Sequence, residues 1–160
     1  MADSYFRQYR NCDLSAIYYL ETQVTANWTG ITVVKGFPLN DKAELPIISI
    51  RVTDSSPTAR EIGSRSMFNY YLIIIDIFAK HAGQREDLAQ FIEDTVINDF
   101  VYYEHSHPSG DPTSLSRVAN GKVVFQEFVS SGPVNFGEDA SLYDKNRHNV
   151  SYNVRLSKNS

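Results

Sequence analysis

The chain has 160 residues, of which 42% are hydrophobic, and its formal net charge is −4. This length and composition suit one compact domain with a single core, which we assign to residues 1–160. The negative charge argues against a general nucleic-acid-binding domain, because such domains are usually basic. The single cysteine, Cys12, excludes an internal disulfide framework and does not by itself form a zinc site. Residues 1–10 lack the apolar segment of a secretory signal, so we expect an intracellularly made protein.

The first predicted element is a helix over residues 13–27. Asp13 is a suitable N-cap, and Gly30 is a suitable stop. Apolar side chains recur at helical spacing and form one stripe: Leu14, Ile17, Leu20, Val24 and Trp28. We expect this stripe to pack on a sheet. Tyr19 falls off the stripe, and an exposed Tyr19 is a candidate for contact with a neighbouring molecule. We expect residues 1–12 to be a flexible terminus.

Two strands are predicted next, over residues 31–37 and residues 46–53. Apolar and polar side chains alternate in the second one, as in a half-buried strand. A polar segment, residues 39–44, separates the two strands. We therefore expect them to form an antiparallel pair.

Residues 68–78 are apolar on both alternating faces and rich in β-branched and aromatic side chains. This run predicts a central strand that is buried on both sides. A helix over residues 85–98 follows, with Glu86 and Asp87 in its first turn, where the helix dipole favours negative charge. Its expected buried face consists of apolar and small polar side chains: Leu88, Phe91, Ile92, Thr95 and Val96.

The last predicted strands cover residues 101–104, 122–129 and 150–156, and residues 157–160 are expected to be flexible. The element order is then α-β-β-β-α-β-β-β. This order predicts an α+β fold, with a mostly antiparallel sheet, two main helices packed on one side of it, and long loops at the sheet ends.

Three predicted loops, residues 54–66, 105–121 and 130–148, exceed the usual length of roughly 4–6 residues. They carry apolar side chains, including Phe136 and Tyr143, in which a disordered linker would be poorer. We therefore expect these loops to fold against a partner outside the subunit. The first loop also carries three charged residues suited to charge-assisted hydrogen bonds: Arg60, Glu61 and Arg65.

Two arrangements of polar residues are candidates for a metal site or a nuclease active site. A metal site would draw on four side chains: His105, His107, Asp111 and His148. No third histidine stands at a fixed spacing from the first two, so we favour ordinary surface histidines. Asp76 and Lys80 do not have the spacing of a restriction-type nuclease core, so we interpret Asp76 as a strand-end carboxylate paired with a nearby arginine or lysine. Residues 130–133 are expected to form a turn and lack a nucleophile elbow. We expect no enzyme, no cofactor and no metal.

With these elements in place, the chain resembles the small head-tail joining proteins of long-tailed bacteriophages, above all the tail terminator family. The resemblance covers most of the chain, from the helix over residues 13–27 to the closing strands. It includes the loop with Ala59-Arg60-Glu61-Ile62-Gly63 and the apolar strand that ends in Ile75-Asp76-Ile77-Phe78-Ala79-Lys80. The segment 130–148 is a departure, because it is long.

This resemblance implies a structural virion protein that forms a homohexameric ring. Such a ring binds the finished end of the tail tube, stops polymerisation and offers a docking face to the neck or head. The implied partners are the chain itself, the tail tube protein and a neck or head-completion protein, with DNA only as passing cargo and no membrane. The implied location is the virion tail or neck, assembled in the host cytoplasm. The alternatives are another neck, connector or tail-tube protein, and, less favoured, a metal-dependent enzyme.

Candidate interface residues come from the charged loop, the first helix and the last long loop. They are Arg60, Glu61, Arg65, Tyr19, Phe136 and Tyr143.

Overall fold

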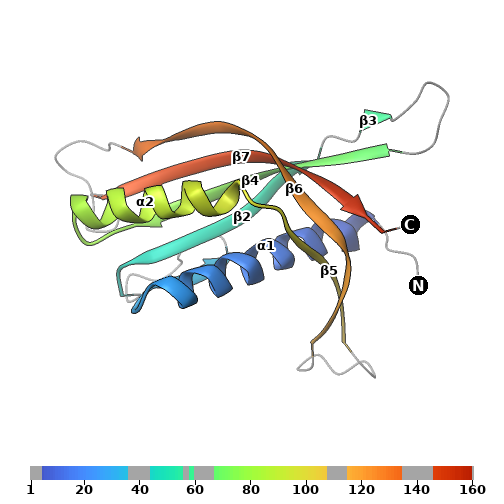
Figure 1. The fold of residues 1–160 in the computed structure, drawn as a ribbon, viewed down its shortest axis with the longest axis horizontal. Coiled ribbons are helices and arrows are strands. Elements are labelled where there is room, and N and C mark those ends of the chain that lie inside the picture. The colour runs from blue at the N-terminus through green and yellow to red at the C-terminus, as the bar shows by residue number, and fades with distance from the viewer. Residues whose placement is uncertain are drawn as a thin grey trace.

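The computed structural model describes residues 5–35, 44–55, 58–59, 67–107, 115–134 and 146–159. Within these ranges the chain forms two helices and seven strands. They are α1 (Tyr5–Asn27), β1 (Thr32–Lys35), β2 (Ile47–Ser55), β3 (Thr58–Ala59), β4 (Met67–Phe78), α2 (Ala82–Val96), β5 (Phe100–Ser106), β6 (Ser116–Val134) and β7 (Arg147–Lys158). The fold is α+β with a mostly antiparallel sheet, as predicted (Figure 1).

The strand order in the sheet is β1-β2-β4-β7-β6-β5, and β3 pairs with β4 beside this path. All pairs are antiparallel except β1 and β2, which run parallel, with Thr32 opposite Ile47 and Lys35 opposite Ile50. The predicted antiparallel pair is therefore wrong. A polar segment between two strands indicates a hairpin only when the second strand begins beside the end of the first. Here β2 begins beside the start of β1.

Strand β4 occupies the predicted central position, between β2 and β7. Ile73, Ile75 and Ile77 are fully buried on its inner face. On its outer face Leu72 and Ile74 are only half-buried, so burial is complete on one side of the strand and partial on the other. The strand was recognisable because its apolar residues run without interruption.

Helix α1 begins eight residues before its predicted start at Asp13. Residues 5–12 therefore belong to the fold, and Cys12 is fully buried in the core. Asp13 is not an N-cap: it lies inside the helix, and its Oδ2 is 2.6 Å from Lys35 Nζ at the end of β1. Gly30 follows the helix with a φ of +75°, a conformation that glycine adopts without steric cost, so the predicted stop is confirmed.

Both helices pack into one core on the same face of the sheet. Ala16 and Leu20 from α1 and Leu88 and Ile92 from α2 belong to one buried cluster with the inner face of β4. Helix α2 lies on β4 and β7, whereas α1 contacts β1 and β2 at one end of the sheet and β5 at the other. The sheet therefore curls around α1 (Figure 1).

The predicted second helix is confirmed with shifted ends. Its N-cap is His81, whose Nδ1 accepts the Gln84 N–H at 3.1 Å. The early start moves Glu86 and Asp87 out of the first turn, so they do not provide the predicted dipole interaction.

Strands β5, β6 and β7 are longer than predicted and take up much of two expected loops. Strand β6 covers both the turn expected at residues 130–133 and residues 116–121 of the loop expected at 105–121, and β7 continues to Lys158 rather than ending in a flexible tail. The register between β6 and β7 shifts at Gln126 and again at Val129, which marks two bulges. Both bulges lie within the predicted strand over residues 122–129. The missed ends of β6, residues 116–121 and 130–134, contain serine, glycine and proline residues that are typical of turns.

Gly121 lies where β6 passes from β5 to β7, and its φ is +117°. A Cβ atom built there would lie 2.1 Å from the Ser157 carbonyl oxygen, so only glycine fits this close approach of two backbones.

Candidate functional site

The most distinctive feature of the described surface is a long stretch of unpaired strand edge on β6. Strand β5 pairs with β6 only from Ser116 to Val123. Strand β7 pairs with the other side of β6 as far as Val134. Residues 124–134, which we call the β6 edge, therefore have a neighbouring strand on one side only within the described part of the chain. Open backbone donors and acceptors of this kind are a template for pairing with another chain.

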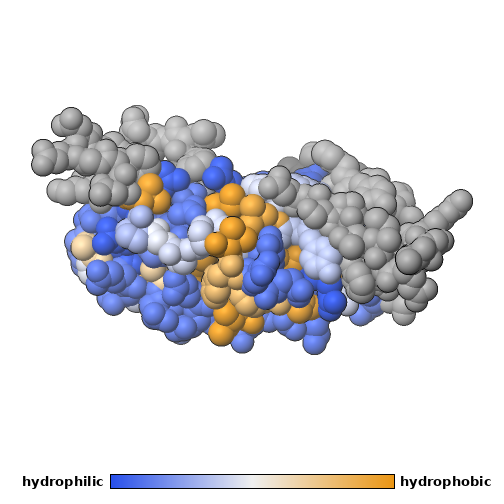
Figure 2. Space-filling model, turned by 90° about the horizontal axis from the view of Figure 1, so that it is seen from above, coloured by the Kyte–Doolittle hydropathy of each residue, from blue (hydrophilic) through white to orange (hydrophobic). Residues whose placement is uncertain are grey.

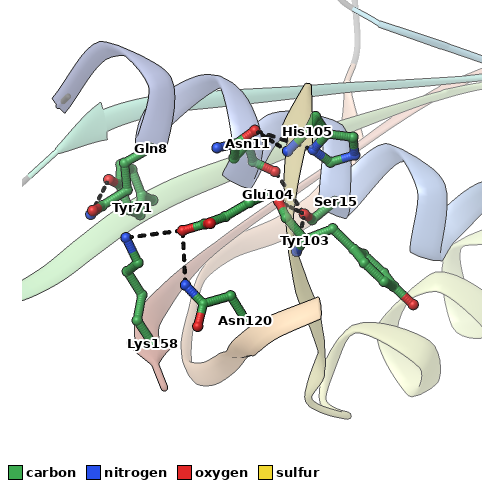
Figure 3. Close-up of polar contacts among 9 residues, drawn as sticks. All are labelled: Gln8, Asn11, Ser15, Tyr71, Tyr103, Glu104, His105, Asn120 and Lys158. Atoms are coloured by element: carbon green, nitrogen blue, oxygen red, sulfur yellow. Dashed lines mark hydrogen bonds and ion pairs between the residues drawn. The ribbon is translucent and has the colours of Figure 1, made fainter. Parts of the chain in front are cut away.

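The edge of β5, in contrast, is covered by side chains of α1 (Figure 3). Ser15 Oγ accepts the Tyr103 N–H at 2.9 Å, and Asn11 Oδ1 accepts the His105 N–H at 3.0 Å. Asn11 Oδ1 is also 3.2 Å from His105 Nδ1. Helix α1 thus satisfies the backbone donors that a further strand would otherwise bind.

The same close-up shows a second set of polar contacts, which lies where β5, β6 and β7 meet. Glu104 on β5 accepts a hydrogen bond of 2.8 Å from Asn120 on β6, and its carboxylate is 3.4 Å from Lys158 Nζ on β7 (Figure 3). These contacts join the three strands at Asn120, four residues before the β6 edge begins at residue 124. The start of the edge is therefore held in place by its neighbours.

At the other end of the sheet, β1 has only four residues and ends in Lys35, which pairs with Asp13 of α1. A short edge strand with a lysine is a common way to limit unspecific pairing. Both ends of the strand order therefore carry a recognisable form of protection.

The β6 edge lacks such charges and exposes apolar side chains. Glu127 is the only charged residue among residues 124–134. Phe128 is 41% exposed and Val129 is 56% exposed. Figure 2 shows hydrophobic surface gathered across the middle of the face on which β6 lies uppermost in Figure 1, with hydrophilic surface on either side. A strand edge that is both unpaired and apolar is typical of an interaction site.

Beside the β6 edge, three polar side chains meet in an order that does not match a hydrolytic triad. Ser131 Oγ donates to the Glu93 carboxylate, and the same oxygen lies 2.9 Å from His148 Nε2. Its single hydrogen is directed at Glu93, so His148 Nε2–H donates to the serine. In a hydrolase the acid orients the histidine, and the histidine takes the serine proton. This group instead fastens α2 to β6 and β7.

The histidines considered as metal ligands lie at opposite ends of β6. His105 is opposite Arg117, and His148 is opposite Pro133. His105 and His107 line one small pocket of about 70 Å³ between α1 and β5, while Asp111 lies outside the described residues. No group of three or more histidine, cysteine or acidic side chains is placed to hold a metal ion in the described ranges.

The two strand histidines share a lowered pKa. Burial lowers the pKa of His105, and Arg117 adds to the effect. Burial also lowers the pKa of His148, while the nearby Glu93 carboxylate partly opposes the change.

Asp76 has the structural role that the sequence predicted. Its Oδ1 accepts hydrogen bonds from Arg147 Nη2 and from Asn149 Nδ2, both at 2.9 Å, and from Arg147 Nε at 3.2 Å. The aspartate is 1% exposed. Oδ1 of this carboxylate joins β4 to β7 through partners from the fold itself, whereas Oδ2 is buried without a hydrogen-bond partner among the described residues.

Among the candidate interface residues, Tyr19 is the one that the structure describes, and it is not exposed. Its ring stacks on Phe100 with the centroids 5.0 Å apart, and its hydroxyl donates to the Thr95 carbonyl at 3.1 Å. The expectation of an exposed Tyr19 was wrong because α1 is buried on more than its one apolar stripe. The curled sheet and α2 also cover the side of α1 that carries Tyr19. The neighbouring Tyr18 is the exposed ring, at 38%. The other candidates lie outside the described residues, and their interface role stays a prediction: Arg60, Glu61, Arg65, Phe136 and Tyr143.

Sequence reasoning missed the β6 edge because it placed residues 130–134 in a loop, and because a sequence pattern does not show on which side the predicted strand 122–129 is paired. A signal was present: from Val123 to Val134 the chain carries one charged residue and several apolar ones.

No described helix has the length and apolar character needed to cross a membrane. No protein-family model matches the chain, and no curated protein sequence matches it.

Proposed function

We propose that this protein is a structural subunit of a long-tailed bacteriophage, a tail terminator that forms a ring, caps the tail tube and joins it to the neck or head. The observation that supports this proposal most is the β6 edge, an unpaired and apolar stretch of strand on an otherwise well-fastened sheet. An assembly subunit needs such a surface, whereas a monomeric protein gains nothing from exposing it. The sequence resemblance supplies the kind of assembly.

The polar groups of the described chain support the same interpretation. Asp76 is held by Arg147 and Asn149, and Ser131 lies between Glu93 and His148. Each of these groups joins two elements of the fold through partners within the chain. We therefore assign them to the rigidity of the subunit, which a ring component needs in order to keep its contacts in register.

The proposed mechanism is geometric. Identical subunits that contact each other through different surfaces close into a ring when the rotation between them closes. A ring whose symmetry matches the end of the tube occupies every site at which the next tube subunit would add, so polymerisation stops. The charged segment with Arg60, Glu61 and Arg65 is the proposed contact with the tube or the next subunit.

The test combines the purified protein with a polymerising tail tube protein of a long-tailed bacteriophage. We expect electron micrographs to show one ring at the end of each tube and tubes that stop growing when the protein is added. Incorporation along the whole tube would identify a tube protein instead, and a ring bound to portals but not to tubes would identify a connector. A strict monomer, alone and with tubes, would remove the ring proposal.

A further inference from the structure

We infer that the β6 edge of one subunit pairs with strand β1 of a second copy of this chain, so that neighbouring sheets join edge to edge. This inference rests on the proposed function for the closure of the ring. Its own basis is the strand arrangement of the described subunit. Strand β1 ends the strand order on one side, and the β6 edge is the unpaired segment nearest the other side.

The contrast between the strand edges indicates where the partner binds. Ser15 and Asn11 occupy the donors of β5, so this strand has no need of a neighbour. Among the described contacts, Glu93 of α2 meets the Ser131 hydroxyl of the β6 edge, but no helix side chain is bonded to the backbone of this edge, and its residues include one charge. Natural sheets usually block an edge that is meant to stay free. Two bulges and Pro133 limit pairing along part of the β6 edge, whereas its exposed apolar side chains and single charge are consistent with an edge that is paired over a short stretch in the assembled protein.

The strand directions favour a second copy in the same orientation. Strand β1 runs parallel to β2, and the following pairs, β2 with β4, β4 with β7 and β7 with β6, are all antiparallel. Strands β1 and β6 therefore run in opposite directions. Two copies placed side by side in the same orientation bring β1 of one antiparallel to β6 of the other. Antiparallel pairing is the more stable arrangement per residue, and the same step can be repeated around a ring.

The residues on the two edges are chemically complementary. The β6 edge carries a single acid, Glu127, and β1 carries a single base, Lys35, whose side chain is 57% exposed. Val33 and Val34 of β1 would lie against the apolar side chains of the β6 edge, Phe128 and Val129. The lysine that discourages unspecific pairing of β1 thus attracts the one edge that carries an acid, which gives the contact its specificity.

The proposed contact between β1 and the β6 edge is small, so its hydrogen bonds and its apolar side chains contribute in different ways. An antiparallel ladder of four residues provides about four hydrogen bonds, compared with roughly ten in a typical protein interface. The ladder alone is therefore too small to hold two subunits together, and it sets the register. Burial of the exposed Phe128 and Val129 side chains supplies the main stabilisation.

Cross-linking tests the pairing directly. Val129→Cys and Thr32→Cys proteins are prepared separately, mixed at high concentration and treated with a short bis-maleimide reagent. Cys12 does not interfere, because its thiol is fully buried. We expect a cross-linked dimer in the mixture and none in either protein alone. Val118→Cys is the matched control, since Val118 lies on the β5-paired part of the same strand and is 65% exposed; it should not link to Thr32→Cys.

Four outcomes would overturn the inference. A dimer of Val129→Cys with itself would show symmetric pairing of two β6 edges. Equal linking by the Val118 control would show unspecific contact. Absence of any link at Val129, both alone and with tail tubes present, would show that the edge is not used between copies, and a tube protein linked at Val129 would assign the edge to that partner.

A second measurement separates this inference from the proposed function. Val129→Lys should weaken self-association at least tenfold in sedimentation experiments, while Val118→Lys should leave it unchanged and both proteins keep their melting temperature within a few degrees. If Val129→Lys abolishes rings but wild-type rings never cap tubes, the pairing stands and the terminator function fails. If Val129→Lys still forms rings that cap tubes, the function stands and the pairing is wrong.

Discussion

Ser15 takes the place of a neighbouring strand for Tyr103: its Oγ accepts the Tyr103 N–H at 2.9 Å and donates its own hydrogen to the Asn11 carbonyl at 2.7 Å. Asn11 does the same for His105, so two polar side chains on one face of α1 close one edge of the sheet. This arrangement explains why a long helix has buried polar residues at these positions. The β6 edge differs, because no such cover of its backbone is present among the described residues.

The first prediction concerns this cover. Ser15→Ala should lower the free energy of unfolding by about 1–3 kcal/mol, because the Tyr103 N–H loses its acceptor in a buried site. Thr22→Ala is the control, since its hydroxyl bonds the Tyr18 carbonyl in the same way on the exposed side of α1. The control should change stability by less than about 0.5 kcal/mol. Urea denaturation measures both, and equal effects would show that Ser15 does not protect the edge.

The second prediction concerns the buried pair of Asp76 and Arg147. Asp76→Ala should cost about 3–5 kcal/mol, because Arg147, only 15% exposed, loses the carboxylate oxygen that accepts hydrogen bonds from its Nε and Nη2. Replacing both residues by leucine should cost less than the sum of the single changes, which a double-mutant cycle measures. Lys158→Met breaks a half-exposed pair with Glu104 and should cost at most about 1 kcal/mol. Additive effects at Asp76 and Arg147 would contradict the pairing.

The third prediction concerns the thiol of Cys12. Burial, together with the neighbouring Asp13 carboxylate, raises the pKa of this thiol to about 12. The thiolate is the reactive form, so the native protein should resist a thiol reagent at pH 8, and labelling should be rapid only in denaturant. Rapid labelling of the native protein would show that α1 separates readily from the sheet.

The fourth prediction concerns pH. The folded protein holds His105 and His148 at a pKa below the ordinary value of 6.5, chiefly because of burial. The unfolded chain therefore binds more protons near and below that value. Stability from these groups is present above pH 6.5 and is lost as pH falls toward their lower folded pKa values. Urea midpoints between pH 8 and pH 5 should show this loss. His105→Gln and His148→Gln should each reduce it, and an unchanged slope in both variants would assign the loss to other groups.

The parts of the fold that were predictable are those with a clear local pattern. Helix α2 follows one period, strand β4 is a continuous apolar run, and Asp76 at the end of that run implied a basic partner. Strand β6 was predictable only over residues 122–129, because its two ends, residues 116–121 and 130–134, contain the serine, glycine and proline residues that are typical of turns. Tyr19 was misplaced because the curl of the sheet, which brings β5 against α1, is a tertiary feature that no local pattern carries.

The last prediction concerns the charged segment that contains Arg60 and Arg65. The pairing of β3 with β4 places Ala59 opposite Met67, so both ends of this segment are held against the sheet. Charge reversal of residues in a solvated connection typically changes stability by only about 0.5 kcal/mol. The double variant Arg60→Glu with Arg65→Glu should therefore keep the wild-type melting temperature. If the segment contacts the tube or the next subunit, charge-assisted bonds are lost there, and tail capping should fail.

The matched control is Lys80→Glu with Lys122→Glu, which makes the same change in net charge at two exposed positions outside the segment. The control should cap tails normally, because its altered charges lie away from the proposed contact. The measurement is the distribution of tail lengths, and the fraction of tails joined to heads, in micrographs of particles assembled with each variant. Tails of uniform length joined to heads in the Arg60 and Arg65 variant would show that this segment is not the attachment site. Failure of both variants alike would assign the effect to net charge rather than to the segment.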